Sequence, residues 1–455
     1  MAVWSSVEVA NLSKDFRLDA EHYQPEYLAQ EQATTKRRSV ELRTIADVSD
    51  GNHLSIAEEF SESGVRYLRG QDLSDFFISD ADPIYIPERL YNTLGRSHMY
   101  AGDVLVGIVG TIGSVGLVTK RHGKLTGNCK LAIIRANAIP AEYIAAYLTS
   151  RIGQNEIQRR IRGAVQMGLI LPDLRTLPIV MPTDEESDGI VNLVKGAERN
   201  RERSRELIQD AEDLLTESVG LSALDFSESL FYQCDFSDLN AARRFGAEYF
   251  MPCKQRVFNA LAEKSRGPLS MSYTSARDLF DPISAIRGDL VRNFDLSDAL
   301  NTVLDDRVLP MPAIEVGSTK KKFRAGDVVI SRLRSYLREI ALVRITGSVP
   351  AVGSTEFIVL RPRAAMKGIM SQETLLVFLR SLPVQTILKW SQDGSQHPRF
   401  NEHQLLAVPV PTAVEKISPD IDRLVNKALQ AQAEAARLLE VAKVEIAKIV
   451  LKGAP

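Results

Sequence analysis

Arg17-Leu-Asp-Ala-Glu-His-Tyr-Gln-Pro25, near the start of the chain, returns as Arg244-Phe-Gly-Ala-Glu-Tyr-Phe-Met-Pro252, at an offset of 227 in the numbering. Both segments read R-x-x-A-E, followed by two aromatic positions and then x-P, with histidine at one aromatic position of the first segment. Internal repeats decide the architecture of a chain, because each repeat is one structural unit. The pair therefore predicts that the 455 residues form two related halves.

Three further pairs of segments follow in the same order. They are Ala101-Gly-Asp-Val104 with Ala325-Gly-Asp-Val328 at an offset of 224, residues 126–135 with 352–361 at 226, and residues 177–182 with 406–411 at 229. One such match is weak. Four matches in order, at a nearly constant offset, indicate a duplication.

A long charged helix is predicted after each copy. The first spans residues 184–219, contains no proline, and is interrupted in its apolar stripe by Asn200 and Ser204. The second spans residues 418–450, with Ser418 as the N-cap and Pro419 as the first helical residue. The stripes consist of Ile190, Leu193, Ala197, Leu207, Ala211 and Leu214, and of Ile421, Leu424, Ala428, Ala431, Ala435, Leu438, Ala442 and Ile449.

Spacings of three and four place each stripe on one helix face, and each helix would be roughly 50 Å long. A narrow apolar seam between polar faces favours pairing of the two helices as an antiparallel coiled coil. The alternative is that each helix packs on its own domain.

Each copy mixes strands and helices. Residues 104–109, 130–135, 328–330 and 356–360 are short β-branched runs typical of buried strands, whereas 140–162 and 371–390 have helical patterns. The expected fold class is α+β, with two homologous globular domains separated by two long paired helices. The expected boundaries are 1–183 for the first globular domain, 184–219 for the first helix, 220–412 for the second domain and 413–455 for the second helix.

Composition excludes several classes of protein. A formal net charge of −2 gives no global case for nucleic-acid binding, so such a function must rest on local clusters. Cys129, Cys234 and Cys253 are far apart, which argues against a disulfide framework or a zinc site and suits a reducing compartment. Neither a signal peptide nor a membrane span is evident, so we expect a cytoplasmic protein.

The order of globule, long helix, globule and long helix resembles the DNA-specificity (S) subunit of type I restriction–modification systems, over essentially the whole chain. Ala101-Gly-Asp-Val-Leu-Val-Gly-Ile-Val-Gly-Thr-Ile-Gly113 resembles a central strand and turn of that family, and Gly353-Ser-Thr-Glu-Phe-Ile-Val-Leu-Arg-Pro362 one of its common phrases. The segment from Arg17 to Pro25 resembles the family's opening segment. Gly163-Ala-Val-Gln166 and Gly394-Ser-Gln396 resemble the loop that closes each target-recognition domain.

The resemblance implies a non-catalytic subunit whose two target-recognition domains each read one half of a bipartite site in double-stranded DNA. The helices would set the gap between the halves and dock two methyltransferase subunits, with restriction/translocase subunits as further partners. One departure is that the second copy carries Ser331-Arg-Leu-Arg-Ser-Tyr-Leu337 in place of the Gly-rich turn.

Candidate DNA contacts are Lys, Arg and polar side chains in the segments that the family aims at the groove. The densest basic stretch, residues 320–344, holds eight Lys or Arg, and a solvated charged face is the alternative for it. Helix-surface charge is the alternative for residues 151–175. The candidates are Arg69, Gln71, Arg159, Arg160, Arg162, Gln166, Lys320, Lys321, Lys322, Arg332, Arg334, Tyr336, Gln396 and Arg399.

Searches for catalytic or cofactor sites give nothing. Gly107, Gly110, Gly113 and Gly116 lie between strand-like segments instead of opening a helix, as a dinucleotide-binding loop must. No P-loop, no N-P-P-Y type loop and no metal-ligand spacing among the six histidines is present. We therefore expect no catalytic residue, cofactor or metal. The alternatives left open are the recognition subunit of a related two-part system and a self-sufficient nuclease or methyltransferase.

Overall fold

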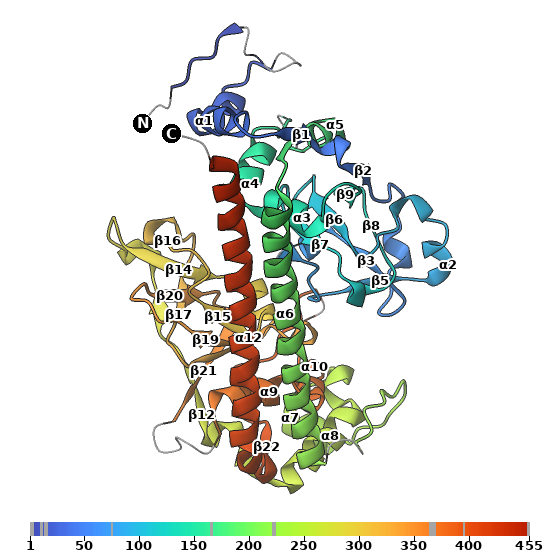
Figure 1. The fold of residues 1–455 in the computed structure, drawn as a ribbon. Helices are drawn as coiled ribbons and strands as arrows, with labels where there is room; N and C mark the ends of the chain where they lie inside the picture. Colours follow the sequence, from blue (N-terminus) through green and yellow to red (C-terminus); the bar gives the residue numbers. More distant parts are fainter. Residues whose placement is uncertain are drawn as a thin grey trace. The chain divides into compact units, whose positions relative to one another are not determined.

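The computed structural model describes residues 4–9, 12, 17–73, 76–163, 167–220, 224–363, 370–394 and 396–452 (Figure 1). The chain divides into two compact units. Unit 1 comprises Met1–Asn200 and Ala433–Pro455, and unit 2 comprises Arg201–Gln432. Each long helix therefore contributes one part to each unit.

Unit 1 contains a five-stranded sheet with the order β2-β9-β6-β7-β4, whose strands are antiparallel except for the parallel pair β4 and β7. A smaller sheet has the order β5-β3-β8. The larger sheet's strands are β2 (Ala46–Asp50), β4 (Phe76–Phe77), β6 (Asp103–Gly107), β7 (Val115–Leu117) and β9 (Leu131–Ala136). The other strands are β1 (Ser39–Glu41), β3 (Val65–Leu68), β5 (Ile84–Ile86), β8 (Leu125–Gly127) and β10 (Pro178–Val180).

Unit 2 repeats this topology. Its five-stranded sheet has the order β12-β21-β18-β19-β15, again antiparallel except for the parallel pair β15 and β19. These strands are β12 (Tyr273–Ala276), β15 (Val303–Asp305), β18 (Val328–Ser331), β19 (Ile340–Arg344) and β21 (Phe357–Pro362). The shared order and strand directions confirm that the two globular regions are homologous.

The second sheet of unit 2 keeps the pattern of β5-β3-β8 and extends it. Its order is β13-β17-β20-β14-β16, in which β16, β14 and β20 correspond to β5, β3 and β8. β17 and β13 extend the sheet beyond β20, whereas the equivalent edge beyond β8 in the described part of unit 1 carries only an isolated antiparallel bridge between Met99 and Leu125. The remaining bounds are β11 (Ser265–Pro268), β13 (Leu279–Phe280), β14 (Leu290–Phe294), β16 (Met311–Pro312), β17 (Lys320–Phe323), β20 (Ala351–Gly353) and β22 (Pro409–Pro411).

A pair of short helices covers one side of each large sheet. α3 (Ala141–Thr149) and α4 (Arg151–Gln158) do so in unit 1, and α9 (Gln372–Arg380) and α10 (Leu382–Lys389) in unit 2. Each pair was expected as one helix, but the chain breaks at Ser150 and Ser381, whose extended backbones start a second helix. The other short helices are α1 (Pro25–Thr34), α2 (Glu88–Tyr91), α5 (Leu171–Arg175), α7 (Phe236–Ala242), α8 (Pro252–Glu263) and α11 (Glu402–Leu406).

The two long helices, α6 (Asp184–Val219) and α12 (Thr412–Leu451), pair within each unit (Figure 1). In unit 1, Lys452 lies 3.6 Å from Glu186 and the Leu438 side chain packs against Gly196, so the helices run antiparallel. The seam is continuous with the core of each unit, because Ile190, Val194 and Ala197 of α6 share a buried cluster with residues of α3 and α12. In unit 2, a second buried cluster contains Ala211, Leu215 and Val219 of α6 together with Ile421 and Val425 of α12. The predicted helix pairing is confirmed.

The expected start of the second long helix was wrong. α12 begins at Thr412 and contains Pro419 within it. Ser418 does not act as its N-cap but is buried, and its hydroxyl exchanges a hydrogen bond of 2.9 Å with Thr374 of α9. The turns on either side of this proline are held against the unit 2 core, by Val414 before it and Ile421 after it.

Candidate nucleic-acid interface

Two predicted segments of unit 2 meet beyond one end of the central strand β18 of the large sheet: the β18–β19 loop and residues 393–399. Arg334 N donates to the Pro398 carbonyl at 3.1 Å, and Phe400 N donates to the Arg332 carbonyl at 3.1 Å. Asp393 and Arg399 close the second loop with two backbone hydrogen bonds of 2.8 Å. Gly394 occupies a left-handed conformation, φ +96°, that allows this turn.

The corresponding segments of unit 1 meet in the same way. The backbone N of Arg162 donates to the Gly168 carbonyl at 2.9 Å, and the backbone N of Gly168 donates to the Arg162 carbonyl at 2.8 Å. Leu169 N donates to the carbonyl of Ile108, in the β6–β7 turn, at 2.9 Å. Gly163 also has a left-handed backbone, φ +113°. The turn after β3 joins them, since Gly70 packs closely against Thr111. Sequence segments that were separately predicted to face DNA thus converge in both units.

Arg332 and Arg399, both predicted DNA contacts, converge on the carboxylate of Glu356. Arg332 Nε donates to Glu356 Oε2 at 2.8 Å, while Arg399 donates from Nε to Oε2 and from Nη2 to Oε1, each at 3.0 Å. Both arginine side chains remain about two-fifths exposed, at 42% and 40%. Two guanidinium groups are therefore held at fixed positions at the surface while part of each can still reach a ligand.

Glu356 is the anionic centre of this cluster. Hydrogen bonds from Arg399 and Arg332 lower its pKa to about 2, against the opposing effect of partial burial. The carboxylate is therefore ionised throughout the physiological range. It offsets one of the two positive charges and fixes the planes of both guanidinium groups.

Arg334 and Arg338 have left-handed backbones, with φ of +48° and +52°. In the corresponding turn of unit 1, Gly110 and Gly113 take this conformation, with φ of +81° and +84°. A side chain in this conformation costs roughly 1–2 kcal/mol, and such strain persists mainly at functional sites. Between the two arginines, Tyr336 is 60% exposed.

The strained turn is supported from behind. Gln392 Nε2 donates to the Ser335 hydroxyl at 2.5 Å, and Arg380 Nη1 donates to the Arg338 carbonyl at 3.2 Å. Ser335 is buried. The turn is thus held in its strained shape, with Tyr336 presented outward.

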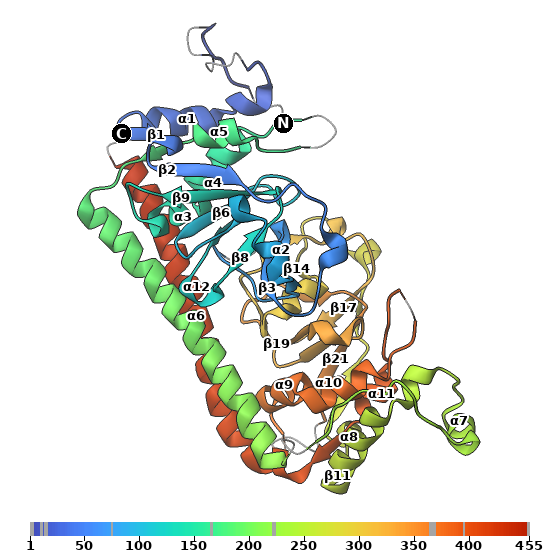
Figure 2. The same cartoon turned by 90° about the vertical axis from the view of Figure 1, so that its right-hand side faces the viewer.

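Lys320, Lys321 and Lys322 form most of β17, one of the two strands that extend the second sheet of unit 2 (Figure 2). Lys322 is exposed, whereas Lys320 and Lys321 are partly buried. Burial lowers the pKa of Lys321, and the charges of Arg332 and Glu356 also act on that ammonium group. Lys321 therefore lies within electrostatic range of the arginine–glutamate cluster. Gln396 is exposed on the neighbouring loop.

In unit 1, Arg69 is held by two carboxylates. Its backbone N donates to Asp72 Oδ2 at 2.7 Å, and Nη2 donates to the Asp82 carbonyl at 2.7 Å with Asp82 Oδ2 at 3.3 Å. Gln71, in the same turn, is exposed. This turn presents one fixed arginine and one solvent-facing amide beside the β6–β7 turn.

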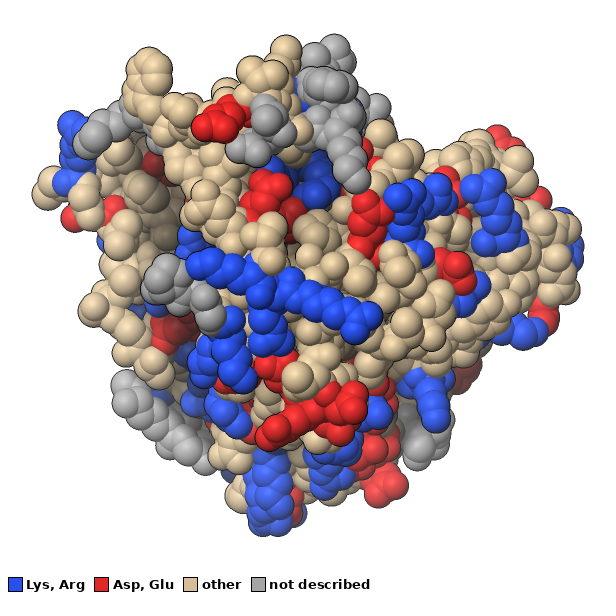
Figure 3. Space-filling model, turned by 45° about the horizontal axis from the view of Figure 1, so that its top comes forward, with Lys and Arg blue, Asp and Glu red and all other residues tan. Residues whose placement is uncertain are grey.

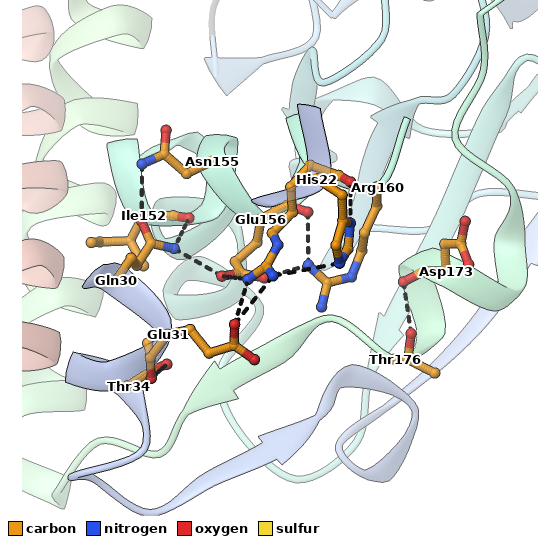
Figure 4. A network of polar contacts seen from close by, with 11 residues as sticks. His22, Gln30, Glu31, Thr34, Ile152, Asn155, Glu156, Arg160, Asp173 and Thr176 are labelled. Atoms are coloured by element: carbon orange, nitrogen blue, oxygen red, sulfur yellow. Dashed lines mark hydrogen bonds and ion pairs between the residues drawn. The ribbon is translucent and has the colours of Figure 1, made fainter. Parts of the chain in front are cut away.

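Arg159 bonds or pairs with His22, Glu31 and Glu156, three labelled members of the polar network in Figure 4. Its side chain is only 5% exposed, and its guanidinium donates to Glu31 Oε2 at 3.1 and 3.2 Å. His22 Nδ1 bonds the Arg159 carbonyl at 2.7 Å, and burial lowers the pKa of His22. The geometry gives Arg159 a structural role: it joins α4 to α1 and to the segment that follows Arg17.

Arg160 and Arg162 lie closer to the surface. Arg160 is paired with the buried Glu156, and Arg162 makes a bidentate pair with Asp173 at 2.5 and 2.8 Å. Arg162 is the more accessible of the two, at 38% of its side chain against 16%. Gln166, the remaining predicted contact, lies outside the described residues.

Basic side chains are interspersed with acidic ones on the face drawn in Figure 3. Most of the predicted arginines in fact carry a carboxylate partner, which agrees with the near-neutral net charge of −2. Within the described part of the chain no group of His, Cys, Asp and Glu could hold a metal ion. No described helix combines the length and apolarity needed to cross a bilayer.

Sequence reasoning missed Glu356, although it lies in the quoted segment 353–362. A lone acidic residue at the start of a strand gives no signal of pairing with arginines that are 24 and 43 residues away. Arg338 was counted in the basic stretch but not chosen. Arg338 is the counterpart of Gly113 at the end of the Gly-rich turn of the first copy. An arginine in place of a turn glycine could have indicated a strained backbone at this position.

No family model and no curated protein sequence matches the chain. Among solved structures, it is similar to the S subunit of a type I restriction–modification system from M. genitalium, with 14% identity, coverage of 90% of this chain and 95% of that chain, and a TM-score of 0.40. It is similar to the HsdS subunit from Thermoanaerobacter tengcongensis, with 16% identity, 91% and 96% coverage, and a TM-score of 0.31. It is also similar to a chain from a structure that describes complex assembly and conformational transition of the type I restriction–modification system. That match has 16% identity, covers 91% of this chain and 97% of that chain, and has a TM-score of 0.30.

Proposed function

We propose that this chain is a DNA-specificity subunit that reads a bipartite site in double-stranded DNA and directs partner methyltransferase subunits to it. The observation that carries the proposal is the duplication of a complete reader. The same sheet topology recurs in each unit, and the same two loops meet at the end of the central strand of each large sheet. Two equivalent readers on one chain suit a target with two half-sites.

The proposed target-recognition domains are residues 1–183 and 220–412, with residues 184–219 and 413–455 as the spacer helices. Helices of roughly 50 Å would hold the readers at a fixed separation and set the gap between half-sites. By resemblance to type I specificity subunits, two methyltransferase subunits dock on these helices, and restriction/translocase subunits join as further partners. Methyl transfer takes place on the partner, and the complex acts in the cytoplasm.

In the second reader, Arg332 and Arg399 are suited to bidentate hydrogen bonds with guanine O6 and N7. Glu356 presents both guanidinium groups in a fixed orientation, so little side-chain freedom is lost on binding. Arg334 and the exposed Tyr336 extend the reading surface along the strained turn. Lys320, Lys321, Lys322 and Gln396 add charge and polar groups beside it, suited to phosphate oxygens.

In the first reader, the proposed contacts are Arg69, Gln71, Arg160, Arg162 and Gln166. Arg69 and Arg162 are each fixed by carboxylates yet partly exposed, at 23% and 38%. This is the same device as in the second reader: an arginine held by an acidic residue at the surface. We assign Arg159 the structural role described above and omit it from these contacts.

The test is an electrophoretic mobility assay with a randomised DNA duplex library. The purified chain alone is expected to bind weakly and with strong salt dependence, because phosphate contacts dominate non-specific binding. Added methyltransferase subunits should tighten binding and select a bipartite sequence. An assembled complex without any sequence preference would contradict the proposal.

A further inference from the structure

Large apolar side chains are exposed at the same register near the start of each copy. In unit 1 they are Trp4, Val9 and Leu18, and in unit 2, at the same offset of 227 that relates Arg17 to Arg244, they are Phe231, Phe236 and Phe245. All six are between 76% and 92% exposed. We name the two segments arm 1 (described residues 4–9, 12 and 17–18) and arm 2 (residues 231–245).

Each arm is fastened to its own unit by a hydroxyl group at one shared position. Ser5 Oγ donates to the Tyr23 carbonyl at 2.6 Å, and Tyr232, its counterpart at the shared offset, donates to the Ala247 carbonyl. The acceptors lie in equivalent short 3-10 helices, Ala20–Tyr23 and Ala247–Phe250. The exposed side chains therefore sit on two segments with the same local attachment. In unit 2, arm 2 includes α7 and extends away from the sheets of that unit (Figure 2).

Single exposed apolar side chains are ordinary on a protein surface, but three that recur at equivalent positions in both copies point to a shared interface, in which a partner would bury them. Aromatic anchors such as Trp4, Phe231 and Phe236 supply much of the binding energy in protein interfaces. The loops proposed to face DNA do not use these apolar side chains, since those loops lie at the end of the central strand of each large sheet.

The repetition specifies the occupant. A duplicated surface on one chain fits one kind of protein bound in two copies. Glu8 and Asp235, again related by the shared offset, are both exposed and directly precede the second apolar residue of their arms. The complementary surface is thus an apolar groove bordered by a lysine or arginine.

We propose that each arm docks one methyltransferase subunit, so that the two arms hold two copies of the same partner through Trp4, Val9 and Leu18 and through Phe231, Phe236 and Phe245. This inference rests on the proposed function for the identity of the partner. It adds a contact beyond the spacer helices, and it assigns one docking arm to each reader.

The test measures stoichiometry by native mass spectrometry and affinity by titration, using the full chain and the purified methyltransferase subunit of the same system. Three variants are compared: Trp4→Ser/Val9→Ser/Leu18→Ser for arm 1, Phe231→Ser/Phe236→Ser/Phe245→Ser for arm 2, and the control Ile283→Ser/Ile286→Ser/Leu309→Ser. The control residues are also 71–92% exposed but belong to no repeated arm. Circular dichroism and thermal melting should be unchanged in all three, since none of the side chains is buried.

The wild-type chain and the control are expected to bind two subunits. Each arm variant should lose one of the two binding events by at least about tenfold, as removal of aromatic anchors does. Glu8→Lys and Asp235→Lys should each weaken the site on the same arm. Two undiminished binding events in both arm variants would overturn the inference and leave the proposed function standing. A wild-type chain that binds no methyltransferase subunit would overturn both, and arm-dependent self-association of the chain would assign the arms to a second copy and overturn the inference.

Discussion

Arg135 donates two hydrogen bonds to the buried carboxylate of Asp103, from Nε to Oδ1 and from Nη2 to Oδ2, each at 2.9 Å. Arg361 makes the same pair of bonds to Asp327, at 2.8 and 2.7 Å. In each case the aspartate lies at or just before the central strand and the arginine on the neighbouring antiparallel strand. The repeated Ala-Gly-Asp-Val motif and the repeated strand that contains the arginine are distant in sequence, but in both units they are joined by this ion pair.

Loss of this interaction should destabilise unit 2 more than unit 1. Arg361→Met leaves Asp327, which is 2% exposed, without its guanidinium, so we expect the free energy of unfolding to fall by about 2–4 kcal/mol. Arg135→Met should cost less, because Arg135 is 48% exposed and water reaches the site. Differential scanning calorimetry of the full chain resolves the effect.

Arg277→Met is the matched control, since Arg277 is 80% exposed and its ion pair with Glu402 lies at the surface. Its expected effect is within about 1 kcal/mol. Equal losses from the Arg361 and Arg277 substitutions would show that the buried pair contributes nothing special.

Glu356 gives a stability dependence on pH. Its pKa is lowered from 4.5 to about 2 in the folded chain, so its charged form stabilises the fold at any pH above about 4.5. That contribution is lost as the pH falls from 4.5 towards 2. The difference in stability between wild type and Glu356→Gln should therefore be constant above about pH 5 and shrink below about 4.5, as measured by urea unfolding at each pH.

Glu356→Gln should also change DNA binding. Without the carboxylate charge, Arg332 and Arg399 are free to contact phosphates, so non-specific affinity and its salt dependence should both increase. Sequence discrimination should fall, because the guanidinium planes are no longer fixed. Unchanged salt dependence would indicate that neither arginine reaches DNA.

The left-handed backbones of Arg334 and Arg338 should lower the stability of unit 2 while positioning the turn for DNA binding. Arg334→Gly and Arg338→Gly should each stabilise unit 2 by about 0.5–1 kcal/mol, since relief of about 1–2 kcal/mol is partly offset by the greater chain entropy of glycine. Both should weaken sequence-specific binding. Arg243→Gly is the control, because Arg243 has φ +51° outside this turn. It should give a similar gain in thermal stability with no change in DNA affinity, and a loss of affinity there would refute a specific role for the turn.

Arg159 separates structural from contacting arginines. Arg159→Met should lower the stability of unit 1 by about 3 kcal/mol, because a buried guanidinium that joins α4 to α1 is removed, Glu31 loses its partner and the buried Glu156 keeps only Arg160 as a cationic partner. Arg151→Met, at a position that is 78% exposed, should change stability little. If Arg159→Met left the melting temperature unchanged while abolishing DNA binding, Arg159 would be a contact after all.

Much of the fold could be predicted from repeated motifs. β6 and β18, and β9 and β21, were expected from β-branched runs, and the pairing of α6 with α12 from their apolar stripes. The breaks at Ser150 and Ser381 and the start of α12 at Thr412 were missed. Ser150 and Ser381 lie within helical sequence patterns, yet each has an extended backbone that ends one helix and starts the next. Ser418 and Pro419 favour a helix start, yet they lie inside α12, whose first turns pack on the unit 2 core.

The candidate site could be predicted only in part. Local composition identified Arg332 and Arg399, but their convergence on Glu356 depends on a backbone connection between residues 334 and 398 that leaves no trace in sequence. The same limit explains Arg159. It lies beside a helix with a mostly polar pattern, and its burial arises from Glu31 and His22, which are distant in sequence.

The most direct test of the account is to determine the selected DNA sequence of the assembled complex with Arg332→Ala/Arg334→Ala. The account predicts that discrimination falls by about 1–3 kcal/mol per lost base contact in one half-site, while the other half-site and the gap stay unchanged. Equal weakening of both half-sites would contradict it, because those arginines would then act through phosphates or through the fold.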